Sequence, residues 1–201
     1  MNLSAVILAG GESRRMGRDK ALLEFDGKSL LTLAVDRVRD AGIEEIFISG
    51  RPGGDYSAVG RPVLLDLDPG LGPMGGIERG LHRCTAPLLL VLAVDLPHMT
   101  GEFLQSLAKR CDPLSGIVPE LHGRLEPLAA IYPKRCHAFA LAMLTHGRRA
   151  ARDFAEDCLR ERAAKRWIVP ASEASCLANW NSPNDLTPRV GYKVQAAETP
   201  R

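Results

Sequence analysis

Two glycine-rich stretches of this sequence carry residue types that could bind a phosphorylated ligand. The first, LAGGESRRMGRDK, covers residues 8–20 and combines adjacent glycines with four positively charged side chains. The second, DPGLGPMGG, covers residues 68–76. Glycines lack a Cβ atom, so backbone N–H groups can face anionic oxygens, while arginine and lysine side chains can offset the charge of a triphosphate. Both stretches are therefore candidates for nucleotide binding.

Neither of the two common glycine-rich nucleotide motifs fits the first stretch. A P-loop has the spacing G-x-x-x-x-G-K-[ST], but here Gly17 is followed by Arg18 and Asp19. A dinucleotide fingerprint has the spacing G-x-G-x-x-G, which the adjacent Gly10 and Gly11 do not provide. Two interpretations remain open at this point: a phosphate-binding loop of another design, and a solvent-exposed turn that is basic.

Apolar segments alternate along the chain with helical patterns, and this alternation predicts the fold class. We expect strands at residues 4–8, 45–49, 63–65, 88–94, 116–119, 128–132 and 166–169, and helices at 29–41, from the second glycine stretch to about 83, and at 101–110, 138–144 and 150–164. Residues 88–94 (LLLVLAV) lack polar alternation, which is typical of a strand buried on both faces. The prediction is an α/β fold, three-layered and doubly wound (Rossmann-like), with a mostly parallel central sheet and helices on both faces.

Ligands of such sheets bind beyond the carboxyl ends of the strands. The segments that follow the expected strands are therefore the best candidates for a site: residues 9–20, 49–54, 66–76 and 95–98. Asp95 comes directly after the most apolar strand, and burying a carboxylate there is costly unless something compensates its charge. A role as helix N-cap fits Asp95 less well, because Thr100 is better placed for the cap.

The composition is typical of one soluble globular domain. The chain has 201 residues, of which 45% are hydrophobic and 25% charged, with a net charge of +2. This charge is too small to indicate nucleic-acid binding, and the apolar runs are shorter than the roughly 18–20 residues of a membrane span. The five cysteines are odd in number and show no C-x-x-C spacing, so we expect reduced thiols, a cytoplasmic location and no signal peptide. We expect a single domain at 1–187 and a flexible tail at 188–201.

Five segments match, in the same order, the motifs of a known enzyme family. They are residues 8–20 (of the form L-A-G-G-x-S-x-R-M-G-x-D-K), 68–77 (DPGLGPMGGI), 94–99 (VDLPHM), 126–134 (EPLAAIYPK) and 179–186 (NWNSPNDL). The sequence resembles the nucleotidyltransferases, and most closely the molybdenum cofactor guanylyltransferase (MobA) family, over about residues 3–186. Several motifs in register are far more specific than one loop. The resemblance implies the nucleotide-diphospho-sugar-transferase type of α/β fold.

The resemblance also implies an activity. The family transfers GMP from GTP to the phosphate of molybdenum-loaded molybdopterin, which yields the guanine dinucleotide cofactor and pyrophosphate. Mg²⁺ is the implied metal, and GTP and molybdopterin are the implied partners, with cofactor-biosynthesis proteins and molybdoenzymes as further partners. No covalent enzyme intermediate is implied, so the protein has to position two anions and neutralise charge in the transition state.

Site roles are carried over from the family only onto matching positions. The implied nucleotide-binding residues are Leu8, Ala9, Gly10, Gly11, Lys20, Ser49, Asp66, Gly75 and Asp95. Among these and their neighbours, the implied catalytic residues are Lys20, Arg15 and Asp95, with Asp95 holding the metal. Asn179 and Asn181 are implied to contact the pterin substrate. Ser49 stands where the family often has asparagine, and Trp180 where it usually has a smaller aliphatic residue.

Some alternatives remain. A sister enzyme that uses CTP is one, although Gly10-Gly11 and Gly75-Gly76 favour the larger guanine base. A non-catalytic homologue that binds nucleotide or cofactor is another. Lys20 could instead form a surface ion pair with Asp19 or Glu24. Four histidines show no recognisable ligand spacing, and the sequence assigns them no chemistry: His82, His98, His137 and His146.

Overall fold

A computed structural model of the chain describes residues 2–10, 20–65 and 68–180, and its centre is one twisted sheet. Along the sheet the strands are β10 (Ala164–Ile168), β7 (Gly116–Leu121), β9 (Ala129–Pro133), β6 (Leu88–Ala93), β1 (Leu3–Leu8), β4 (Glu45–Gly50) and β5 (Val63–Leu65). A short strand, β8 (Arg124–Leu125), pairs with β7. Strands β1, β4, β5 and β6 pair in parallel, as do β7 and β10, whereas β9 is antiparallel to both of its neighbours. The predicted α/β class with a mostly parallel sheet is confirmed.

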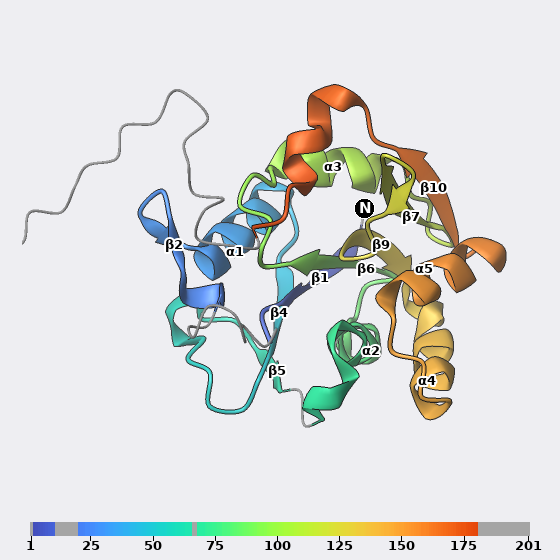
Figure 1. The fold of residues 1–201 in the computed structure, drawn as a ribbon, viewed down its shortest axis with the longest axis horizontal. Coiled ribbons are helices and arrows are strands. Elements are labelled where there is room, and N and C mark those ends of the chain that lie inside the picture. The colour runs from blue at the N-terminus through green and yellow to red at the C-terminus, as the bar shows by residue number, and fades with distance from the viewer. Residues whose placement is uncertain (1, 11–19, 66–67, 181–201) are drawn as a thin grey trace, which may run out of the picture.

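Helices cover both faces of the sheet, as predicted (Figure 1). Helices α1 (Leu30–Asp40) and α3 (Gly101–Lys109) pack in one core cluster. Helices α2 (Pro73–Arg83), α4 (His137–Thr145) and α5 (Ala151–Arg160) pack in the other. Alternate residues of β6 enter alternate clusters, with Leu88, Leu90 and Leu92 in the first and Leu89 and Val91 in the second. This two-sided burial explains why the strand shows no polar alternation.

The predicted helix boundaries agree with the local hydrogen bonding. Ser29 is the N-cap of α1, and its hydroxyl accepts a hydrogen bond from the Thr32 amide at 3.1 Å. Thr100 caps α3 in the same way through the amide of Phe103. Gly42, with φ of 82°, stops the chain after α1 in the left-handed conformation that glycine adopts readily.

The sequence prediction was wrong about the end of the expected helix at 150–164. Helix α5 ends at Arg160, and Arg162 has φ of 54°, which turns the chain into β10 two residues earlier than predicted. The strand β8, which the turn at His122 and Gly123 joins to β7, was not predicted. A hairpin of β2 (Glu24–Phe25) and β3 (Lys28–Ser29) was not predicted at all.

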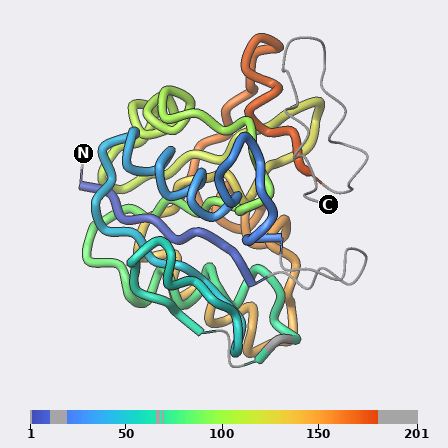
Figure 2. The backbone as a smooth tube through the Cα atoms, turned by 90° about the vertical axis from the view of Figure 1, so that its left-hand side faces the viewer, coloured from blue at the N-terminus to red at the C-terminus, as the bar shows by residue number. Residues whose placement is uncertain are grey.

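Short 3₁₀ helices complete the fold: η1 (Lys20–Leu22), η2 (Ser57–Val59), η3 (Pro69–Leu71), η4 (Lys134–Cys136) and η5 (Ala171–Leu177). Segment η5 lies near α3 at the C-terminal end of the described chain (Figures 1 and 2). Leu177 and Trp180 join the α1–α3 core cluster. The last residues of the predicted domain and the predicted tail at 188–201 lie outside the described residues.

All five cysteines lie in the described part of the chain, where they are buried and form no disulfide. Among the residues that the structure describes, no helix is both long and apolar enough to cross a membrane.

Candidate active site

Three parallel strands end together and form the rim on which the candidate site is built. Leu8 of β1 is level with Ser49 of β4 on one side and with Ala93 of β6 on the other. Backbone hydrogen bonds continue past the strands, from the Ala9 amide to the Ser49 carbonyl at 2.8 Å and from the Val94 amide to the Leu8 carbonyl at 3.2 Å. The residues that follow each strand therefore leave the sheet at one shared edge, as the predicted topology requires.

Lys20 and Asp95 meet at this rim. The Lys20 ammonium lies 3.3 Å from Oδ2 of Asp95, and each side chain is 24% exposed. Lys20 is the last residue of the first glycine stretch and the first of η1, while Asp95 follows β6, so the pair joins residues 75 positions apart in the chain. Among the described residues the ion-pair partner of Lys20 is Asp95 and not Glu24, while Asp19, the other surface partner considered, lies outside the described residues. An ion pair that water still reaches contributes little free energy, so both side chains stay available to a charged ligand.

Trp180 closes this arrangement through its backbone. Its carbonyl accepts a second hydrogen bond from the Lys20 ammonium at 3.1 Å, and its amide donates to the carbonyl of Asp95 at 2.9 Å. The indole itself is only 6% exposed and meets the ring of Phe25 edge-on, with centroids 5.9 Å apart. Trp180 is thus a core residue that anchors the chain at the rim and holds Asn179 beside the site.

A pocket of about 170 Å³ opens next to Asp95. Its lining residues come from the end of β6, from the β8–β9 connection and from the C-terminal segment: Ala93, Asp95, Leu96, Glu126, Pro127, Leu128, Ala129 and Asn179. Asp95, Glu126 and Asn179 supply its polar side chains, and Asn179 is exposed. The predicted pterin contact at Asn179 therefore lies in the same pocket as the predicted metal ligand.

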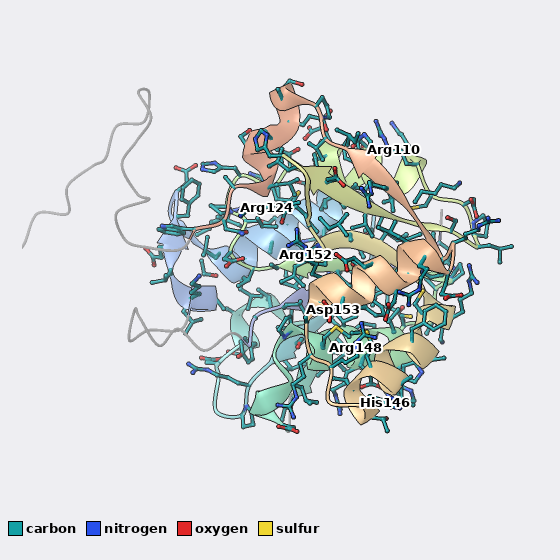
Figure 3. All side chains as sticks on the ribbon, turned by 45° about the vertical axis from the view of Figure 1, so that its right-hand side comes forward. Arg110, Arg124, His146, Arg148, Arg152 and Asp153 are labelled. Atoms are coloured by element: carbon teal, nitrogen blue, oxygen red, sulfur yellow. The ribbon has the colours of Figure 1, made fainter. Side chains whose placement is uncertain are left out.

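Glu126 carries a perturbed carboxyl group in this pocket. Burial raises its pKa above the usual value, and the positive charges of Arg152 and Arg124 oppose that rise. The two arginines come from α5 and β8 and lie on the same side of the molecule (Figure 3). Glu126 belongs to one of the five motif segments, but neither it nor Arg152 was predicted to have a role in the site, because only the fold brings α5 beside the β8–β9 connection.

The second glycine stretch fixes the start of α2 against the rim. Gly72, with φ of 57°, precedes Pro73, where α2 begins. A Cβ atom on Gly76 would lie 2.4 Å from Oγ of Ser49 and 2.6 Å from Cδ2 of Leu8, so this glycine lets the first turn of α2 pack directly on β1 and β4. The positive end of the helix dipole therefore lies beside the predicted nucleotide-binding backbone.

The described residues bring together most of the predicted site. Leu8, Ala9 and Gly10 follow one another at the end of β1. Ser49 is 6% exposed beneath α2, and Gly75 is buried within α2. Gly11, Arg15, Asp66 and Asn181 lie outside the described residues.

The arrangement of strands and helices is similar to that of proteins of known structure. Molybdopterin-guanine dinucleotide biosynthesis protein A from Archaeoglobus fulgidus superposes with a TM-score of 0.71, over 91% of this chain and 94% of that one, at 22% identity. The chain belongs to the MobA-like NTP transferase domain family, whose model matches residues 5–164.

Two relatives share the length of this chain. A protein of Opitutus terrae named "probable molybdenum cofactor guanylyltransferase" is 36% identical over 186 residues, which is 91% of this chain and 92% of the relative. A protein of the same name from Natranaerobius thermophilus is 31% identical over 191 residues, covering 92% of this chain and 93% of the relative.

Proposed function

We propose that this protein transfers GMP from GTP to the phosphate of molybdopterin and so forms the molybdopterin guanine dinucleotide. The observation that carries the proposal is the Lys20–Asp95 pair at the rim of the sheet, beside the pocket of Asn179 and Glu126. Lys20 supplies a cation suited to phosphate and Asp95 a carboxylate suited to a metal ion, and the two come from separate segments of the chain. The family membership and the names of the two relatives support the same assignment.

The proposed reaction is an in-line displacement at the α-phosphorus of GTP. An oxygen of the molybdopterin phosphate forms the new P–O bond, the bond between the α-phosphorus and the bridging oxygen breaks, and pyrophosphate leaves with that oxygen. The backbone of Leu8, Ala9 and Gly10 would hold the nucleotide, and Lys20 would bind its phosphates as a compact positive charge. Arg15, outside the described residues, would assist Lys20.

The donor at the rim fits a magnesium ion. Asp95 offers carboxylate oxygens, the hard ligands that Mg²⁺ prefers, and it is exposed enough for substrate phosphates and water to complete the coordination. When bound, the metal would neutralise charge on the phosphate oxygens. Asp95 would then bind the ion instead of Lys20, and Lys20 would bind the phosphates instead of Asp95. Breaking the Lys20–Asp95 ion pair would cost little free energy, because the pair is partly exposed.

The pocket next to Asp95 is proposed to receive the second substrate. Asn179 supplies an amide that can both donate and accept hydrogen bonds. Arg124 and Arg152 bring positive charge to the Glu126 side of the pocket, where the molybdopterin phosphate would approach. Asn181 is proposed to act with Asn179, and Ser49, Asp66, Gly11 and Gly75 to act on the nucleotide side. We place the reaction in the cytoplasm, with molybdoenzymes as recipients of its product.

Pyrophosphate release tests the proposal directly. Purified protein is mixed with Mg²⁺, molybdenum-loaded molybdopterin and one nucleotide at a time. We expect release with GTP, little with CTP or ATP, and none when molybdopterin or Mg²⁺ is omitted. Turnover with CTP alone would contradict the guanine assignment. Nucleotide binding without any turnover would instead indicate a non-catalytic homologue.

A further inference from the structure

Three side chains that are not part of the candidate active site form a cluster that the sequence did not reveal. Glu78, His82 and His137 place one potential metal-ligating atom each within 4.8 Å of the other two. They are the one such group of histidines, cysteines and carboxylates found among the described residues. His82 and His137 are far apart in the chain, so the spacing of the histidines gave no sign of the cluster.

Two helices build the cluster. Glu78 and His82 are four residues apart on α2, a separation that places both side chains on one face of the helix. His137 is the first residue of α4. The helices lie side by side (Figure 1), and their apolar faces share a core cluster that includes Leu81 and Ala140. The ligand positions are therefore fixed by helix packing rather than by a loop.

The contacts within the cluster show that its side chains already converge. Nε2 of His137 lies 2.7 Å from Oε1 of Glu78 in a hydrogen bond, and the imidazole rings of His82 and His137 have centroids 5.2 Å apart. Bonds of about 2.0–2.1 Å to a tetrahedral ion require ligand atoms about 3.3 Å apart, so the 2.7 Å contact between Glu78 and His137 must open slightly. Side-chain exposures of 28% for His137 and 20% for Glu78 leave room for these rotations and a path for an ion.

Two imidazoles and one carboxylate, with an open fourth position, are a ligand set that zinc accepts. We propose that Glu78, His82 and His137 bind a divalent transition-metal ion of the zinc class, and that this ion ties α2 to α4. In its absence the hydrogen bond between Glu78 and His137 holds the same helix contact more weakly.

Asp95 and His137 lie toward opposite ends of the strands, whereas Glu78 is one helical turn after Gly75 on α2. Asp95 follows the carboxyl end of β6, whereas the other end of β6, Leu88, is level with Pro133 at the end of β9. Segment η4 and the start of α4 follow Pro133 directly. Helix α2 contacts the rim through Gly76, in its first turn, and runs on toward Arg83. The proposed zinc site therefore does not share a ligand with the magnesium site, and either can fail without the other.

The experiment uses the full chain without a histidine tag, after treatment with chelator. Zinc binding is measured by equilibrium dialysis in excess Mg²⁺, which occupies oxygen-only sites. We expect one zinc ion per chain. We also expect the melting temperature to rise by about 5 °C or more when free zinc is about 100 times the dissociation constant.

Single variants assign the ligands. His82→Gln and His137→Gln should each weaken zinc binding by more than about tenfold, since even the loss of a supporting partner of a ligand costs about 10–100-fold. His146→Gln is the matched control, because His146 is exposed at the other end of α4 and should leave binding unchanged. His82 is exposed and its removal leaves the Glu78–His137 bond intact, so this variant folds even if the other does not.

A spectroscopic probe separates this site from the thiols. Cobalt(II) bound to imidazole and carboxylate gives visible d–d absorption without a thiolate charge-transfer band, and excess zinc should abolish it. Binding that persists in both His82→Gln and His137→Gln, a thiolate band, or no stoichiometric zinc at all would each overturn the proposal. Asp95→Asn should bind zinc as the wild type does, so loss of GMP transfer and loss of zinc are separate results.

Discussion

The amide of Trp180 donates a hydrogen bond to the carbonyl of Asp95 at 2.9 Å, and this bond joins the C-terminal segment to the chain just after β6. The same tryptophan accepts from Lys20, so three distant segments meet around one carboxylate. The side chain of Trp180 packs in the core, while its backbone hydrogen bonds position Lys20 and Asp95. The site is therefore organised by the backbone of a residue whose side chain belongs to the core.

Asp95→Asn should abolish GMP transfer while the fold remains. The amide is isosteric with the carboxylate but lacks the charge that holds a hard cation, so we expect kcat to fall by at least about 100-fold. Pyrophosphate release measures the loss, and circular dichroism checks the fold. Asp36→Asn is the matched control, because Asp36 pairs with Lys28 on the surface at 2.7 Å. Near-normal turnover of Asp95→Asn would refute the metal role.

Lys20→Met should lower kcat/KM for GTP strongly and change the stability of the fold little. The lost charged hydrogen bonds to phosphate are worth about 1.5–3 kcal/mol, or roughly 10–150-fold in kcat/KM for GTP. The melting temperature should change little, because the Lys20–Asp95 pair is partly exposed. Lys28→Met, which removes an exposed lysine from an ion pair, serves as the control. Equal effects of the two substitutions on kcat/KM would contradict a phosphate role for Lys20.

Gly76→Ala should destabilise the protein by about 1–3 kcal/mol, because the new methyl group would overlap Ser49 and Leu8. The sign is informative, since glycine to alanine within a helix otherwise stabilises by about 0.5–1 kcal/mol. Urea unfolding measures the change. The double variant Gly76→Ala, Ser49→Gly removes the nearest obstacle and should recover part of the loss. A stabilised single variant would show that α2 does not pack on the rim as described.

The ion pairs of Asp157 should stabilise the folded protein at neutral pH and lose this effect in acid. Burial raises the pKa of its carboxyl, but hydrogen bonds and charge from Arg148 at 2.8 Å and Arg160 at 2.5 Å outweigh it and leave the pKa below the usual 3.8. Because the folded state lowers the pKa, this stabilisation is present above about pH 4 and is lost as the pH falls through the lower, folded value.

We therefore expect Asp157→Asn to lower the free energy of unfolding by about 1–2 kcal/mol at pH 7 and by progressively less below pH 4. Chemical denaturation at several pH values measures this difference. Asp153→Asn is the control, because Asp153 is 45% exposed and lies 3.6 Å from Arg148 (Figure 3). A difference that persists unchanged at pH 3 would contradict the assignment.

Local signals in the sequence were sufficient for the parts of the fold that depend on local rules. The apolar run of β6 and the caps Ser29 and Thr100 were read directly from residue types. The end of α5 was missed because its sequence continues to favour a helix, whereas Arg162 is held in a left-handed turn by the chain's return to β10.

The site was predictable to the extent that strand ends converge in a parallel sheet. That rule placed Lys20 and Asp95 on one rim, and the structure brings them to 3.3 Å. The rule did not predict that Arg152 lies near the pocket, because helix packing brings it there. It also did not predict the hydrogen bonds of the Trp180 backbone. The Glu78–His82–His137 cluster depends wholly on the contact between two helices.

The reversed direction of β9 has a consequence for how such a protein can change its acceptor. Strands β1, β4 and β6 leave the sheet at the rim, but β9 arrives there, so the pocket wall at residues 126–128 precedes its strand. That wall begins in the β7–β8 hairpin and belongs to a separate length of chain from the nucleotide loops. Residues 122–128 can therefore diverge, or be exchanged between relatives, while the machinery that binds the donor nucleotide stays as it is.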